Sequence, residues 1–123
     1  MHSDSIKEFT NELSKRLFDF SVSVFDFLKS VENSPEGNTI RYQLAKCSSS
    51  SGANYEEAQA GSSRADFSNK VRISLREMRE SNYWLRLLYA SKMKYDHELC
   101  KNLIRESGEL KLILGKISQK SKS

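Results

Sequence analysis

Residues 6–31 of this 123-residue chain read IKEFTNELSKRLFDFSVSVFDFLKSV, and an apolar side chain recurs in them every three or four positions. Because an α-helix has about 3.6 residues per turn, this spacing draws one continuous apolar stripe. The stripe consists of Ile6, Phe9, Leu13, Leu17, Phe20, Val24, Leu28 and Val31, with Phe18, Val22 and Phe25 as a second row beside it. The pattern predicts a first helix over residues 4–32, followed by a break around Pro35 and Gly37.

A second long helix is predicted over residues 64–94. Its core stripe is formed by Phe67, Val71, Leu75, Met78, Leu85 and Tyr89. A separate face carries Ile73, Trp84 and Leu87, which is more apolar surface than a helix with one buried side needs. We therefore expect these three residues to form a second buried contact, either within the bundle or at an oligomer interface.

The same helix carries the positive charge of the chain. The net charge is +4, and residues 63–95 hold eight basic and three acidic groups. At 100° per residue, four arginines fall within one arc away from the core stripe: Arg72, Arg76, Arg79 and Arg86. This asymmetry favours a polyanionic partner, and a solvated basic face is the other interpretation. Tyr83 and Trp84 beside them are either a stacking platform for bases or part of a core or interface.

The two remaining segments are less uniform. Ile40, Leu44, Cys47, Ser51, Tyr55 and Ala58 keep helical spacing and predict a helix over residues 38–60. The stretch Ser48–Gly52 nevertheless has the composition of a linker, so the pattern alone leaves helix and linker both open. A last helix over residues 96–118 has a core stripe of Leu99, Leu103, Leu110, Ile113 and Ile117.

These segments predict one all-α domain over residues 1–123. Four helices with short breaks favour an antiparallel up-down four-helix bundle. No apolar run approaches the roughly 20 residues that cross a bilayer, and the N-terminus lacks the basic and apolar regions of a signal peptide. We therefore expect a cytoplasmic protein without a membrane partner. Cys47 and Cys100 then fit free, buried thiols better than a disulfide framework.

The sequence offers no pattern typical of a catalytic, metal or cofactor site. His97 precedes a glutamate and does not form the Glu-x-x-His pair of metal-binding bundles. Cys47 and Cys100 lack zinc-finger spacing, and the chain has no glycine-rich phosphate loop. Cys100 follows His97 by three residues, but no orienting third group or oxyanion hole is evident. We expect a protein that is not an enzyme and takes no cofactor or small-molecule substrate.

One ordered set of residues points to a family. It comprises Asn54-Tyr55, Glu57-Ala58, Ser63-Arg64-Ala65-Asp66-Phe67, Lys70, Glu77, Glu80 and Tyr83-Trp84-Leu85. This set resembles the signature of the four-helix bundle 23S rRNA intervening-sequence protein family, over residues 6–115 and most densely over 43–88. The resemblance implies that Ser48–Ser51 is helical. It also implies a homo-oligomer, typically a pentamer, and no known enzymatic activity.

A related branch of that fold serves reverse transcriptases of diversity-generating retroelements as a nucleic-acid-binding accessory protein. This chain is less similar to that branch, and it has Ala60-Gly61-Ser62 where relatives often carry a basic residue. Two functions remain open. One is a homo-oligomer that binds RNA or DNA through the four arginines. The other is a protein-interaction scaffold or accessory subunit, for example of a reverse transcriptase, without direct nucleic-acid contact.

Overall fold

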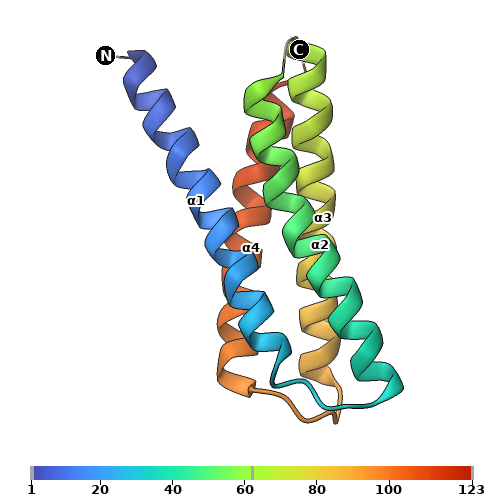
Figure 1. Cartoon of the computed structure of the whole chain (residues 1–123). Coiled ribbons are helices and arrows are strands. Elements are labelled where there is room, and N and C mark those ends of the chain that lie inside the picture. Colours follow the sequence, from blue (N-terminus) through green and yellow to red (C-terminus); the bar gives the residue numbers. More distant parts are fainter. Residues whose placement is uncertain (1, 62, 123) are drawn as a thin grey trace.

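The computed structural model describes residues 2–61 and 63–122 (Figure 1). It contains the helices α1 (His2–Leu28), α2 (Pro35–Ala60), α3 (Arg64–Ala90) and α4 (His97–Lys120), and the described ranges contain no strand. Successive helices run in opposite directions (Figure 1), each packs against the next, and α1 also contacts α4. The predicted all-α class is therefore confirmed. None of the helices in the described part of the chain combines the length and hydropathy that a bilayer crossing requires.

Several helix ends differ from the prediction. α1 ends at Leu28 instead of residue 32, α3 ends at Ala90 instead of 94, and α4 runs over 97–120 instead of 96–118. The apolar pattern continues past the end of α1 because Val31, although outside the helix, is buried with 5% of its surface exposed. The two loops at this end bind each other instead of extending the helices. The Glu32 amide donates to the Lys94 carbonyl at 2.9 Å, and the Lys94 amide donates to the Glu32 carboxylate at 2.8 Å.

The start of α2 lies earlier than predicted, at Pro35 instead of residue 38. Ser34 is its N-cap, and the Ser34 hydroxyl accepts a hydrogen bond of 3.0 Å from the Gly37 amide. Proline suits the first turn of a helix because its missing N–H needs no partner there. Ser62, the last residue of the departure from the family pattern at Ala60-Gly61-Ser62, lies outside the described residues.

The serine-rich stretch of α2 is helical, as the family resemblance implied. It forms a tight seam with α3. Ser51 and Ser74 are fully buried and exchange two hydrogen bonds, each hydroxyl donating to the other residue's carbonyl at 2.8 and 2.7 Å. Small side chains let the two backbones approach, and the mutual bonds satisfy hydroxyls that would otherwise be costly to bury. The predicted α2 core positions, Ile40, Leu44, Cys47, Ser51, Tyr55 and Ala58, are all buried.

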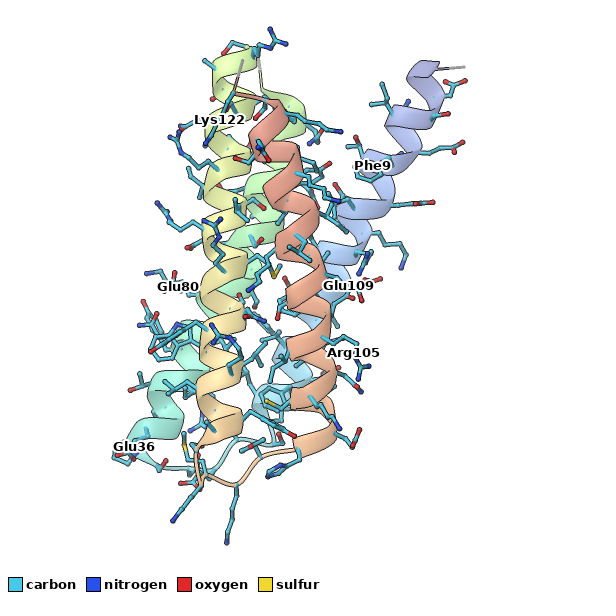
Figure 2. The ribbon with its side chains drawn as sticks, turned by 180° about the vertical axis from the view of Figure 1, so that it is seen from behind. Phe9, Glu36, Glu80, Arg105, Glu109 and Lys122 are labelled. Carbon is cyan, nitrogen blue, oxygen red and sulfur yellow. The ribbon has the colours of Figure 1, made fainter. Side chains whose placement is uncertain are left out.

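The N-terminal part of α1 diverges from the rest of the bundle (Figures 1 and 2). Two residues of its predicted core stripe, Ile6 and Phe9, are therefore exposed at 55% and 48%, whereas the stripe is buried from Leu13 onward. The prediction that Ile6 and Phe9 are core residues was wrong because periodicity fixes the face of a helix and does not fix its direction.

Further core assignments change in α3 and α4, and Phe67 of α3 is only half-buried. In α3, Tyr89 is 43% exposed and its neighbour Leu88 is fully buried in its place. In α4, Leu103 and Leu110 are buried as predicted, while Leu99, Ile113 and Ile117 lie half-buried at the edge of the core. The centre of the α4 stripe is Cys100, Leu103, Ser107, Leu110 and Leu114. The sequence analysis followed large apolar side chains, so it passed over the small buried positions Cys100 and Ser107.

Candidate nucleic-acid interface

The four predicted arginines all lie on the exposed side of α3. Arg72, Arg76, Arg79 and Arg86 are solvent-exposed because the opposite side of the helix supplies the core residues Val71, Leu75, Met78 and Leu85. The structure thus places the arginines where sequence periodicity predicted them. Their local surroundings differ along the helix.

The arginines near the C-terminal end of α3 face lysines of α4. A surface hollow of about 680 Å³ lies between the two helices. It is lined by Arg79, Tyr83 and Arg86 of α3 and by Lys111, Leu112, Gly115, Lys116 and Gln119 of α4. None of these described lining residues is acidic. The hollow therefore combines a concave shape with four cationic side chains.

Asn82 holds two of these cations together. It is 3% exposed, and its amide nitrogen donates to the Ser107 hydroxyl at 2.9 Å and to the Ile104 carbonyl at 3.3 Å. Its amide oxygen accepts a hydrogen bond of 2.9 Å from Arg86 Nε and one of 3.4 Å from Lys111 Nζ. Two cations from different helices thus share one neutral acceptor, which orients them without neutralising their charge.

An aromatic ring lies beside this pair. The Arg86 guanidinium is 5.8 Å from the centre of the Tyr83 ring, within the range of a cation–π contact. Tyr83 is 50% exposed and meets Trp84 edge to face at 5.7 Å between ring centres. The exposed ring and the neighbouring cations are the two components that single-stranded nucleic-acid sites combine, a stacking surface and phosphate contacts. We name Arg79, Tyr83, Arg86, Lys111 and Lys116 the basic seam.

Arg72 and Arg76 lie outside the basic seam and near carboxylates. Arg72 donates to the Asn69 side chain at 2.6 Å and lines a second hollow with Arg64 and Lys122, which also includes Asp66. Arg76 lies 3.7 Å from the Glu77 carboxylate. Glu77 therefore offsets part of the charge of Arg76, whereas the hollow beside Arg72 keeps three cationic side chains against one carboxylate.

Two acidic groups of α4, Glu106 and Glu109, face the other way, toward α1. The Arg16 guanidinium donates to both carboxylate oxygens of Glu106, at 3.1 and 2.7 Å, and to Glu109 at 3.3 Å. The hydrogen bond to Glu106 is the main cause of a raised pKa for Arg16. Because α4 directs these acids to the α1 side, its lysines at the α3 side leave the basic seam positive.

The lysines of the basic seam were missed by the sequence analysis. Lys111 follows Ser107 by four residues, and Ser107 is buried against Asn82 of α3. Residues four apart share a helix face, so the buried serine was the signal that places Lys111 beside α3. That signal becomes readable only once the pairing of α3 with α4 is known.

The predicted interface residues of α3 lie at the edge of the core. Ile73 and Trp84 are half-buried, Trp84 packs against the core, and Leu87 is 45% exposed. Trp84 Nε1 is buried and has no hydrogen-bond partner among the described residues. Part of the second contact expected of this face is therefore made within the chain, and Leu87 remains available to another molecule.

His97 contacts a neighbouring aromatic ring, and the two cysteines are buried. His97 stacks on Tyr95 at 4.3 Å between ring centres. Cys47 and Cys100 are free and buried, and burial raises the pKa of each thiol to about 11. A thiol with that pKa is protonated at neutral pH and is a weak nucleophile. The described residues contain no group of three or more histidine, cysteine or acidic side chains that would hold a metal ion.

Comparisons with known proteins agree with this fold. A family model described as "23S rRNA-intervening sequence protein" matches residues 10–116. A crystal structure from Bacteroides thetaiotaomicron, described as a protein of unknown function from the S23 ribosomal protein family, is 30% identical to the chain with a TM-score of 0.75. The similarity covers 89% of this chain and 97% of that one. A search of curated proteins returned no match.

Proposed function

The chain belongs to the 23S rRNA-intervening sequence protein family, and from this premise we propose that it is a non-enzymatic, cytoplasmic homo-oligomer that binds nucleic acid through the basic face of α3. The basic seam refines the predicted site, because Arg79 and Arg86 act there with Lys111 and Lys116 of α4. Arg72 and Arg76 contribute longer-range attraction from the same face of α3.

The observation that carries the proposal is the arrangement around Asn82. Like charges repel, so Arg86 and Lys111 approach a common acceptor only at an electrostatic cost. A phosphate bound between them removes that repulsion and gains two charge-assisted hydrogen bonds. Tyr83 beside the pair then offers a ring on which an unpaired base stacks.

Assembly makes such a site effective. One seam with a few cations gives weak, non-specific affinity at physiological salt. Repeating the seam around a ring, as in the pentamer that the family resemblance suggests, allows one strand to bind several seams at once and raises its effective affinity. Contacts of this kind read charge and shape rather than sequence.

A second candidate function is a protein-interaction scaffold or accessory subunit. It is favoured by the amount of apolar surface that α1 exposes, including Phe18 at 61%, Phe25 at 51% and Val22 at 48%. Exposed apolar surface of this extent is typical of protein-protein contacts. In this alternative the basic seam is a solvated surface.

Fluorescence anisotropy separates the two candidates. The 123-residue chain is titrated into a labelled structured RNA and a labelled single-stranded DNA at low and physiological salt. We expect binding that weakens steeply as salt rises. The variant R79Q/R86Q/K111Q should bind at least tenfold more weakly, and the matched variant K7Q/K15Q/K29Q, which removes the same charge from exposed positions in and directly after α1, should bind nearly as well as the parent.

The opposite outcome is equally clear. A folded protein that binds neither probe at low salt would show that the basic seam is a solvated surface and would leave the scaffold function. Equal losses in the two triple variants would show that net charge alone, and no particular site, determines binding.

A further inference from the structure

The divergence of α1 opens an apolar groove at one end of the bundle. The groove has a volume of about 670 Å³. Its apolar side chains are Ile6 and Phe9 of α1, Phe67 of α3, and Ile113 and Ile117 of α4. Figure 2 shows Phe9 on the part of α1 that diverges from α3 and α4. These residues belong to core stripes, so the groove is a section of core that the chain's own α1 leaves uncovered.

The rim of the groove is positively charged. Arg64 of α3 and Lys116 and Lys120 of α4 line it, and no acidic residue is among the described residues that do. An apolar floor with a cationic rim fits an apolar surface flanked by carboxylates.

The chain itself presents such a surface. Phe18, Val22 and Phe25 form an exposed apolar row along α1, which we name the ridge and which also borders a shallow hollow beside Ser49 of α2. Their exposures of 61%, 48% and 51% leave about half of each side chain uncovered. Asp19 and Asp26 lie beside this ridge and are exposed at 55% and 67%. Their ion pairs with Lys15 and Lys29 are solvent-exposed, and such pairs are weak enough to be exchanged for others.

We propose that the ridge of one copy of this chain seats in the groove of the next copy. The inference rests on the homo-oligomer of the proposed function and identifies the surfaces that build it. Phe18, Val22 and Phe25 cover the open core section, while Asp19 and Asp26 meet Arg64 and Lys120 of the cationic rim, which leaves Lys116 to the basic seam. Because ridge and groove are different surfaces, the contact is head-to-tail, and it closes into a ring when the rotation between successive copies divides a full turn. The homo-oligomer of the proposed function is such a closed ring. An odd number of subunits, such as a pentamer, is compatible with this kind of contact and not with a twofold one.

The test uses one variant for each surface. The ridge variant F18E/F25E and the groove variant F9E/K120E change only exposed positions, and neither touches Asn82 or the cations it holds. Light scattering should give the parent a mass several times the 14.1 kDa of one chain, and each variant alone should be monomeric. Y42E, at another exposed apolar position on α2, is the matched control and should keep the parent mass.

Mixing the two variants gives the decisive result. The groove variant keeps an intact ridge and the ridge variant keeps an intact groove, so an equimolar mixture should form a 1:1 dimer that cannot extend. Circular dichroism confirms that each variant is folded. As a second measurement, a V22C chain mixed with an F9C chain should form a disulfide-linked heterodimer under mild oxidation, and neither should cross-link alone.

The outcomes separate this inference from the proposed function. An oligomeric parent whose mass survives both variants, or a variant mixture that yields no dimer, would overturn the head-to-tail contact and leave nucleic-acid binding untouched. A monomeric parent would overturn both the contact and the assembly. Anisotropy with the parent protein decides nucleic-acid binding independently in each case.

Discussion

At the scale of single residues, Asn82 links the stability of the bundle to nucleic-acid binding. Replacing it with leucine keeps the approximate volume and removes the acceptor shared by Arg86 and Lys111, together with the bond to Ser107. We expect Asn82→Leu to lower the free energy of unfolding by about 1–3 kcal/mol and to weaken nucleic-acid binding although no charge is lost. Urea denaturation and anisotropy measure the two effects. Unchanged affinity in the folded variant would show that the two cations need no common acceptor.

The two thiols make a separate prediction about pH. Burial raises the pKa of Cys47 and Cys100 to about 11 from the ordinary value of 9.0, so the folded protein disfavours both thiolates. Their contribution to stability is complete below pH 9 and is lost as the pH rises from 9 through 11, because the unfolded chain releases the protons first. We expect slow labelling by iodoacetamide at pH 8, accelerated by urea. Equally fast labelling with and without urea would contradict the buried thiols.

At the scale of helices, the seam between α2 and α3 depends on small side chains. Ser51 is fully buried against Ser74, whereas Ser49, on the opposite face of the same helix, is exposed. Ser51→Leu forces the helices apart and should lower the free energy of unfolding by about 1–3 kcal/mol or more, while Ser49→Leu should change it by less than about 0.5 kcal/mol. Denaturation midpoints compare the two. Equal effects would mean that the serine stretch is not a packing seam.

The helices also show what the sequence predicts and what it leaves open. Spacing alone placed Leu44, Tyr55 and Val71 in the core and Arg86 on the surface, since these depend only on the face of a helix. It misplaced Ile6 and Phe9, because the direction in which α1 leaves the bundle depends on contacts between helices. The uncertainty over Ser48–Gly52 was resolved by family resemblance and not by composition.

At the scale of the whole molecule, the candidate site was only half predictable. The arginines share one helix, so helical geometry placed them on one face. Lys111 and Lys116 join them through the packing register of α3 against α4, which no local pattern encodes. The same packing turns Glu106 and Glu109 toward Arg16 and so separates the acidic side of α4 from its basic side. The charge asymmetry of the sequence thus becomes a charged surface only after folding.

The most direct test of the nucleic-acid function is the salt dependence of binding to a single-stranded DNA. The slope of the logarithm of the binding constant against the logarithm of salt concentration counts the phosphates that the protein neutralises, at about 0.7 per contact for a single strand. If the basic seam binds the strand, R79Q/R86Q/K111Q should reduce the magnitude of this slope by roughly 2 for each seam engaged. K7Q/K15Q/K29Q should leave it nearly unchanged. Equal slopes for the parent and R79Q/R86Q/K111Q would contradict the account.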